Sequence, residues 1–290
     1  MSDKKEIDDF SGIETTGHEW DGIKELNNPL PRWWLWTFYA TIVFAIGYSF
    51  AYPSWPGITG ATKGFLGWSS RANVARDIAE TEASRSELAE KVASMELTEV
   101  QADPALLQFA LAGGASAFKV NCSQCHGAGA AGGGGYPNLL DDDWIWGGDV
   151  NAIHQTLLHG IRFDQDDDTR FAEMPAYGAD EILERPDIVD VAWYVREISG
   201  QETDREAALR GKEIFVDNCA ACHGDDGTGD YDLGAPNLID AIWLYGGEHS
   251  EIVAQISKPQ QGVMPGWKDR LSETTTKQLA IYVHNLGGGE

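Results

Sequence analysis

Cys122-Ser123-Gln124-Cys125-His126 recurs as Cys219-Ala220-Ala221-Cys222-His223, and the two motifs contain all four cysteines of the 290-residue chain. The pattern C-x-x-C-H is the attachment signature of c-type haem. Two thiols on one turn of helix can each form a thioether with a vinyl group of one porphyrin, and the adjacent histidine can bind the iron. The motifs therefore predict two covalently bound haem c groups. The predicted residues are Cys122, Cys125, Cys219 and Cys222 for attachment and His126 and His223 as iron ligands.

Three other uses of paired cysteines fit the sequence less well. A thioredoxin-like redox pair needs no histidine after the second cysteine, and it leaves the second copy unexplained. A structural zinc site could use four cysteines and two histidines, but the two motifs lie far apart in the chain, each in similar flanking sequence. A disulfide framework also leaves the repeated histidine without a role.

The flanks of the two motifs show that the second half of the chain is an internal duplication. Each copy ends in an apolar stretch with helical spacing, at 188–198 and 276–286. This pattern predicts two domains, at 106–200 and 201–290. The matched positions are Gly114 and Gly211, Phe118 and Phe215, Asn121 and Asn218, Pro137-Asn138-Leu139 and Pro236-Asn237-Leu238, 144–148 and 243–247, and Met174-Pro175 and Met264-Pro265.

The duplicated unit resembles the class I cytochrome c fold, so the expected fold class is mainly α with two tandem domains of this type. In that family a first helix with a glycine and an aromatic residue crosses a C-terminal helix, and the glycine permits the close approach because it has no Cβ. The resemblance implies that Gly114 and Gly211 lie at such crossings. The aromatic residues Phe118, Phe215, Tyr194 and Tyr282 are expected to pack in the cores.

Met174 and Met264 are the candidate sixth ligands of the two irons. Of the four methionines, Met1 is the start residue and Met95 lies in a charged stretch outside both predicted domains. Met174 and Met264 occupy equivalent places, and the proline after each biases the methionine towards an extended backbone. A thioether on an extended loop can reach the open face of a haem, and His/Met ligation raises the reduction potential.

The remaining histidines are weaker candidates for the sixth position. His154 and His159 occur only in the first copy, which leaves bis-His ligation of that haem as an alternative. His249 and His284 have no counterpart in the first copy and are expected to be surface or packing residues. His18 precedes the predicted membrane segment and cannot reach a haem.

Trp33 to Tyr52 is a stretch of twenty residues without a charge, flanked by Pro31 on one side and Pro53 on the other. At 1.5 Å per residue, such a helix spans the roughly 30 Å hydrocarbon core of a membrane. Tryptophan and tyrosine at its ends suit the two interfaces. A cleaved signal peptide would need a basic start and a shorter apolar core, so the segment predicts a retained transmembrane helix within 31–56.

Net charge excludes some functions. The chain has 46 Asp and Glu against 21 Lys and Arg, which gives −25. This sign excludes a nucleic-acid binder that is held by phosphate contacts. With 42% hydrophobic residues and 11 Trp, the chain has enough apolar surface to build cores and is not disordered throughout. An acidic surface suits a partner with a basic one.

The segment Gly17-His18-Glu19-Trp20-Asp21-Gly22-Ile23-Lys24-Glu25-Leu26-Asn27-Asn28-Pro29-Leu30-Pro31-Arg32-Trp33-Trp34 is similar to the N-terminal signature of the dihaem subunit of cbb3-type cytochrome c oxidases (subunit III, CcoP or FixP). With two haem motifs in the expected order, this resemblance spans nearly the whole chain. Some members have an additional N-terminal span, and this chain has one only. The remaining organisation is then a docking tail at 1–30 and a partly helical linker at 57–105.

The resemblance implies a role in electron transfer. Such subunits accept electrons from a donor cytochrome c and pass them through two haems to a monohaem subunit and then to the haem–copper subunit, which reduces oxygen and pumps protons. This chain has one membrane helix and no array of intramembrane histidines, so it is expected to have no catalytic residues of its own. Expected partners are these oxidase subunits, the donor and membrane lipid.

The resemblance also bears on two further questions, namely on which side of the membrane the haem domains lie and which methionine binds which haem. Positive charges flank the span equally, with Lys24 and Arg32 before it and Lys63 and Arg71 after it. Haem attachment in bacterial c-type cytochromes takes place in the periplasm, which implies a cytoplasmic N-terminus in the bacterial inner membrane. The family is thought to cross its two methionine ligands between domains, and the spacing in this chain leaves the pairing open.

Two alternative functions remain at this point. A free membrane-anchored dihaem cytochrome c shuttle would fit the haem domains equally well, and only the N-terminal docking segment argues against it. A dihaem peroxidase would need an iron whose sixth ligand is absent or can leave, and the candidate methionine in each copy argues against that enzyme.

Overall fold

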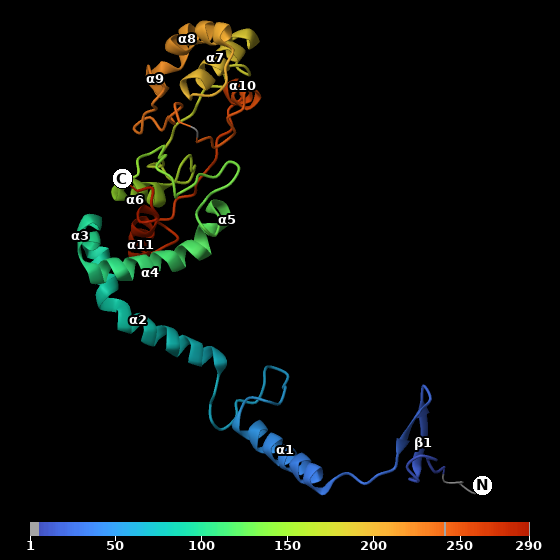
Figure 1. Ribbon diagram of the computed structural model, residues 1–290. Helices are drawn as coiled ribbons and strands as arrows, with labels where there is room; N and C mark the ends of the chain where they lie inside the picture. The colour runs from blue at the N-terminus through green and yellow to red at the C-terminus, as the bar shows by residue number, and fades with distance from the viewer. Residues whose placement is uncertain (1–5, 241, 290) are drawn as a thin grey trace. The chain divides into compact units, whose positions relative to one another are not determined.

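The computed structural model describes residues 6–240 and 242–289. Two compact units divide the chain at Ser84: unit 1 is Met1–Ser84 and unit 2 is Arg85–Glu290. The fold is mainly helical, with one small sheet near the N-terminus (Figure 1). The two haem motifs both lie in unit 2.

Unit 1 begins with a hairpin that the sequence reasoning did not predict. Strands β1 (Thr15–Trp20) and β2 (Ile23–Leu26) pair antiparallel, with Trp20 opposite Ile23. The two-residue turn is Asp21-Gly22, and both residues have positive φ, at 49° and 84°. Asp-Gly is a preferred pair for such a turn because glycine and aspartate tolerate the left-handed region. The side chains of Trp20 and Ile23 are exposed.

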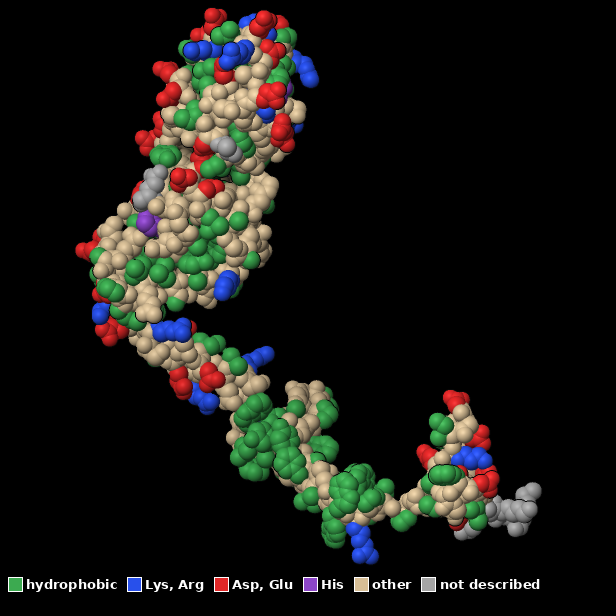
Figure 2. All heavy atoms as spheres, viewed as in Figure 1, with side chains coloured by type: hydrophobic (Ala, Val, Ile, Leu, Met, Phe, Trp, Pro, Cys, Tyr) green, Lys and Arg blue, Asp and Glu red, His purple; other side chains and the backbone are tan. Residues whose placement is uncertain are grey.

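Helix α1 (Arg32–Ala51) corresponds to the predicted membrane span. It is long and apolar enough to cross a membrane, and none of its residues is buried within the protein. Figure 2 shows hydrophobic side chains covering the visible face of this helix. Pro31 precedes the helix, and its fixed φ suits a helix start. Helix α2 (Ser70–Ser94) begins in unit 1, and its last turns carry Val92, which is fully buried in unit 2.

Nine further helices make up unit 2 in the described residues. They are α3 (Leu97–Ala102), α4 (Pro104–Asn121), α5 (Ser123–His126), α6 (Val150–His159), α7 (Arg185–Ile198), α8 (Arg205–Asn218), α9 (Ala220–His223), α10 (His249–Ser257) and α11 (Glu273–His284).

These helices form two hydrophobic cores. Core A is the buried cluster around α4, α6 and α11; it contains Phe118 and Cys122 from the first copy together with Leu279 and Ile281 from the second. Core B is the buried cluster around α7, α8 and α10; it contains Val191 from the first copy with Phe215 and Cys219 from the second. Figure 1 shows α4, α6 and α11 grouped together and α7, α8 and α10 grouped together.

The helix crossings form between the two copies rather than within each copy, which corrects the expectation of the sequence analysis. A Cβ at Gly114 in α4 would overlap the carbonyl oxygen of Gln278 in α11, and a Cβ at Gly211 in α8 would overlap the carbonyl oxygen of Asp190 in α7. The aromatic contacts follow the same exchange. Phe118 packs on Tyr282 with ring centroids 5.6 Å apart, and Phe215 packs on Tyr194 at 5.2 Å.

Two segments carry the chain between the cores. Residues 160–184 lead from α6 in core A to α7 in core B, and residues 258–272 lead back from α10 to α11. The segments pair where they pass: the Ile161 amide donates to the Met264 carbonyl at 2.9 Å, and the Met264 amide donates to the Ile161 carbonyl at 3.0 Å. The ranges 106–200 and 201–290 therefore describe sequence copies, whereas each core combines parts of both.

Candidate haem sites

Each C-x-x-C-H motif forms one short turn of helix directly after a long helix. The Cys125 and His126 amides donate to the Cys122 carbonyl at 3.1 and 3.0 Å, which puts both thiols and the imidazole on one turn. The second motif repeats this geometry: the Cys222 and His223 amides donate to the Cys219 carbonyl at 3.1 and 3.0 Å. In each motif the first cysteine is buried and the second is exposed, and no disulfide joins these four cysteines in the described part of the chain.

Burial raises the pKa of the first thiol in each motif. Desolvation is the main reason that the pKa of Cys122 rises to about 11, and the same cause raises the pKa of Cys219 to about 11. Before haem attachment, burial therefore makes these two thiols harder to ionise than an ordinary cysteine. Their partners in the motif, Cys125 and Cys222, lie one turn away on the exposed side.

The two motif histidines are held by equivalent contacts. Nδ1 of His126 lies 3.3 Å from the Pro137 carbonyl oxygen, and Nδ1 of His223 lies 3.1 Å from the Pro236 carbonyl oxygen. Because a carbonyl can only accept, Nδ1 carries the proton and Nε2 is left as the lone-pair nitrogen for a metal. Burial lowers the pKa of both imidazoles, which favours the neutral form that binds iron.

Each candidate methionine lies in the core that contains the C-x-x-C-H motif of the other copy. Met264, from the second copy, packs against core A with Phe118 and Cys122. Met174, from the first copy, packs against core B with Phe215 and Cys219. Each core thus brings together one C-x-x-C-H motif and one Met-Pro methionine, and the arrangement is crossed. Met95 also packs against core A, at the end of α2, although the sequence analysis set it outside the haem domains.

The other histidines of unit 2 are engaged with protein groups. His154 Nε2 lies 3.2 Å from Thr276 Oγ1, and His284 Nδ1 lies 3.1 Å from the side-chain nitrogen of Gln101. His249 Nε2 donates to the Val189 carbonyl at 3.1 Å, and its ring stacks on Trp193 at 3.8 Å.

His159 belongs to a cluster that links the two copies. Its Nδ1 lies 3.0 Å from the Asp166 carboxylate, and Lys268 Nζ donates to the other oxygen of that carboxylate at 2.9 Å. The Lys268 ammonium is the main cause that holds the pKa of Asp166 at about 2. This ammonium already neutralises the Asp166 carboxylate. We therefore interpret the cluster of His159, Asp166 and Asp168 as the surroundings of an Asp166–Lys268 ion pair and not as a cation site.

The side chains near the crossing segments fit a bound haem. The Arg170 guanidinium lies 5.2 Å from the centre of the Trp146 ring and donates to the Ala152 carbonyl, yet its Nε is buried with no hydrogen-bond partner among the described residues. A buried donor without a partner is costly, so this atom calls for an acceptor. A haem brings two propionate carboxylates, which are the acceptors that guanidinium groups prefer. The donor set in each core, two thiols, an imidazole and a thioether, also fits haem c.

Tyr177 and Arg162 are residues of these sites that the sequence reasoning missed. The Tyr177 hydroxyl donates to the Asn218 carbonyl at 2.6 Å, directly before Cys219, and so ties the Met174 segment to the second motif. The signal in the sequence was an aromatic residue three positions after each methionine, Tyr177 and Trp267. Nothing in the repeat pattern marks Arg162, because its contacts join segments that are far apart in the chain.

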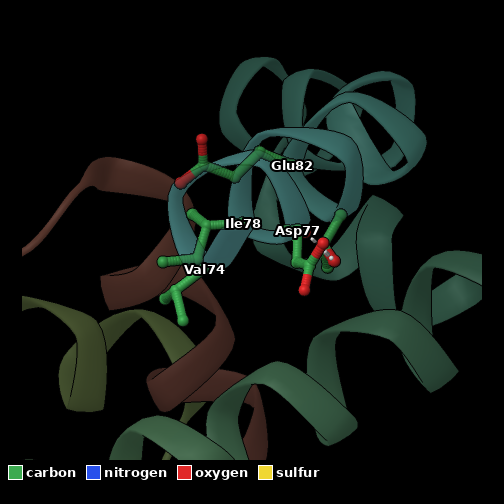
Figure 3. Close-up of a pocket in the computed structure, with 5 residues that line it drawn as sticks. Val74, Asp77, Ile78 and Glu82 are labelled. Carbon is green, nitrogen blue, oxygen red and sulfur yellow. Dashed lines mark hydrogen bonds between the residues drawn. The ribbon is translucent and has the colours of Figure 1, made fainter. Parts of the chain in front are cut away.

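A shallow depression outside these sites lies on α2 in unit 1. Val74, Asp77, Ile78, Thr81 and Glu82 line it, and all five come from this one helix (Figure 3). It contains no thiol or imidazole and has no part in the haem chemistry.

Comparisons with known proteins match the whole chain. The N-terminal domain of cytochrome oxidase-cbb3, FixP, matches residues 12–59; cytochrome c matches 111–199; and cytochrome c oxidase, cbb3-type, subunit III, matches 206–283. The FixPc subunit of a cbb3-type cytochrome c oxidase from Rhizobium leguminosarum bv. viciae is 56% identical over 99% of each chain. The CcoP subunit from Cereibacter sphaeroides is 55% identical over 95% of each, and FixP from Rhizobium meliloti is 53% identical over the full length of both.

Proposed function

This chain belongs to the family of FixP and CcoP subunits of cbb3-type cytochrome c oxidases, and from that premise we propose a role for each of its haem-site residues. It is a dihaem c-type electron-transfer subunit of the oxidase complex. Cys122 and Cys125 hold one haem, and Cys219 and Cys222 hold the other. The observation that carries the proposal is that each core brings one C-x-x-C-H motif together with one Met-Pro methionine.

The proposed iron ligands are crossed between the copies. His126 and Met264 would bind the iron of the core A haem, and His223 and Met174 would bind the iron of the core B haem. A bound c-type haem supplies an iron that takes up and releases one electron at a time. With an imidazole and a thioether from the protein as its ligands, each iron would have no position left for a substrate. The Pro137 and Pro236 carbonyls hold the imidazole rings in the tautomer that presents Nε2.

The protein around the haems supports electron transfer by excluding water and balancing charge. The buried clusters keep Phe118 and Phe215 at less than 2% exposure, which lowers the local dielectric at the attachment helices. Arg170 pairs with a propionate through its free Nε. Electrons enter from a donor cytochrome c, leave to a monohaem subunit, and reach the haem–copper subunit. The net charge of −25 favours a donor with a basic surface, with association that slows as salt rises.

The N-terminal unit anchors and docks the subunit. Residues 1–30 form a cytoplasmic tail, 31–56 the anchor in the inner membrane and 57–105 the linker to the periplasmic haem domains, although the last part of this range, with Val92, is buried in core A. The exposed Trp20 and Ile23 side chains lie opposite each other beside the hairpin turn, and tryptophan is enriched among the residues that dominate binding at interfaces, which supports docking of the hairpin onto the other oxidase subunits.

The ligand assignment is tested by a redox titration of the full-length protein. Met264→His and Met174→His should each lower one potential, and a different one, because imidazole stabilises ferric iron relative to a thioether. Met95→Leu, a methionine that packs against core A without the Met-Pro context, is the matched control and should leave both potentials unchanged. Unchanged potentials and an unchanged Met-to-iron charge-transfer absorption in Met264→His would rule out Met264 as a ligand.

The crossed pairing needs a chain with one haem. In Cys219→Ala/Cys222→Ala, the remaining core A haem should lose its Met-to-iron absorption when Met264 is changed to Ala and keep it when Met174 is changed to Ala. The reverse result would establish pairing within each copy. The haem-to-protein ratio verifies that each variant has loaded one haem.

The place of the subunit in the oxidase is tested by purification from the native host in mild detergent through a C-terminal tag. Co-purification of b-type haem, copper and cyanide-sensitive oxygen uptake is expected. Recovery of the chain alone with two c-type haems, under conditions that keep such oxidases intact, would instead favour a free membrane-anchored shuttle.

A further inference from the structure

Arg162 lies where the two crossing segments meet. It follows Ile161, which pairs with Met264 by two main-chain hydrogen bonds. Its own amide donates to the Arg170 carbonyl at 2.8 Å. Its backbone has φ of +51°, in the left-handed region that side chains other than glycine and asparagine rarely adopt. Such a conformation persists where surrounding contacts determine it, which directs attention to what the side chain does.

The Arg162 guanidinium joins the two methionine segments. Its Nε donates to the Gly262 carbonyl at 2.7 Å, and its Nη1 donates to the Ala172 carbonyl at 3.1 Å. Gly262 lies two residues before Met264, and Ala172 lies two residues before Met174. One side chain therefore binds the same position of both copies.

These carbonyls are the main partners of the Arg162 charge. Within residues 6–240 and 242–289, no carboxylate lies within ion-pair distance of this guanidinium. Desolvation is the main cause that lowers the pKa of Arg162, while the nearby Tyr245 and Glu173 oppose that shift. Hydrogen bonds from a charged donor are shorter and stronger than neutral ones, so the guanidinium holds both carbonyls firmly.

A second side chain links the same segments on one side only. Gln261 lies next to Gly262, and its side-chain nitrogen donates to the Met174 carbonyl at 3.2 Å. This contact ties the second copy to Met174 but makes no bond to the Met264 main chain. Gln261 thus offers a one-sided comparison for Arg162.

We propose that Arg162 is a positioning residue that fixes the segments of both methionines at once and so couples the sixth ligands of the two haems. The inference rests on the proposed ligation by Met174 and Met264. Loss of this one guanidinium therefore frees both segments together, whereas loss of a contact to one segment frees that segment alone. Lysine cannot replace it, because an ammonium on a flexible stem does not offer two donors at fixed separation.

The test measures the Met-to-iron charge-transfer absorption and both reduction potentials of the full-length, haem-loaded protein. Arg162→Met should reduce that absorption at both haems by at least about twofold and lower both potentials, because a loosened thioether is the weaker ligand. Arg162→Lys should restore the absorption at no more than one haem. Gln261→Ala should affect the core B haem alone.

Arg196→Met is the matched control. The Arg196 guanidinium also donates to two carbonyls, those of Glu202 at 3.0 Å and Gly247 at 2.8 Å, and it contacts neither methionine segment. Both absorptions should survive this change. If Arg196→Met reduces them as much as Arg162→Met does, the effect is general destabilisation and the proposal is wrong.

The remaining outcomes distinguish a failure of the methionine ligation from a failure of the coupling by Arg162. A wild-type protein without Met-to-iron absorption would overturn the ligation itself. A wild-type protein with this absorption at both haems, combined with an Arg162→Met protein that keeps it at one or both, would overturn the coupling by Arg162 and leave the ligation intact. If Arg162→Met fails to load haem, Arg162→Lys takes its place as the test: full absorption at both haems in Arg162→Lys would overturn the proposal, and loss at one or both would support it.

Discussion

Met264 and Met174 occupy equivalent positions in the two copies, yet different kinds of contact hold them. The Met264 main chain pairs with Ile161 through two backbone hydrogen bonds of 2.9 and 3.0 Å. The Met174 main chain has one hydrogen-bond partner in the described residues, the side chain of Gln261 at 3.2 Å, and the nearby hydroxyl of Tyr177 ties the segment to Asn218.

Equal sequence motifs therefore do not imply equally stable sites. A contact between main-chain atoms survives most substitutions, because every residue except proline has the same donor and acceptor. A contact made by a side chain disappears when that side chain changes. We therefore expect the core B site to be the more sensitive of the two to point mutations, and the core A site to be the more robust.

The largest expected effect comes from the glycines at the helix crossings. Gly114→Ala places a Cβ against the Gln278 carbonyl and should destabilise core A, and Gly211→Ala places one against the Asp190 carbonyl and should destabilise core B. Overpacking of this kind costs about 1–3 kcal/mol. Denaturant unfolding, followed at each haem, should show a lower midpoint at the affected core.

Because helices of the two copies pack against each other, Gly114→Ala in the first copy should also affect the second copy. Because Gly114 lies against α11, its substitution should also loosen the contacts of the second copy, which limited proteolysis after α10 would detect as faster cleavage in 258–272. Gly129→Ala, at a position where an added Cβ meets no atom within 4 Å, is the control. Equal unfolding curves for Gly114→Ala and Gly129→Ala would contradict the crossing.

An intermediate effect is expected for Tyr177→Phe. The change removes the hydrogen bond to the Asn218 carbonyl and should cost about 0.5–1.5 kcal/mol at core B. The Met-to-iron absorption of the core B haem should be lost at a lower urea concentration than in the wild type, while that of the core A haem is unchanged. Tyr136→Phe, at an exposed tyrosine, is the control. A shift at core A instead would contradict the crossed arrangement.

The weakest of the predicted effects is a loss of stability at acidic pH. The folded state holds the pKa of Asp166 at about 2, below its ordinary 3.8, mainly through Lys268. Since the shift is downward, Asp166 stabilises the fold fully above pH of about 4, and this stabilisation is lost as the pH falls towards 2. The urea midpoint of core A should therefore decrease over that range.

Asp166→Asn removes the titrating group. Below pH of about 4, the stability of the variant should fall less steeply than that of the wild type, because about one proton fewer is taken up on unfolding. At neutral pH the variant should already be less stable, because it lacks the carboxylate that pairs with Lys268. Asp167→Asn, at the exposed neighbour, should keep the slope of the wild type. Identical slopes for wild type and Asp166→Asn would show that the contact with Lys268 does not persist in solution.

Much of the protein follows from local patterns in its sequence. The two C-x-x-C-H motifs, the duplicated flanks and the uncharged stretch from Trp33 to Tyr52 determine two covalent haems, two helical domains and one apolar helix, since each pattern depends on residues that are close together in the chain. Even the hairpin at Thr15–Leu26 had a local signal, the pair Asp21-Gly22, which the charged surroundings obscured.

Which parts of the two copies pack together is a property of the tertiary structure and not of the local sequence. Both first helices carry the same glycine and phenylalanine, and both closing helices are apolar with a tyrosine, so the local pattern fits either partner equally well. The path of the chain after Gly160 selects the exchange, because the segment pairs with Met264 and carries Met174 away to the other core. The Arg162 contacts exist only as a result of that path, which is why no reading of neighbouring residues could have found them.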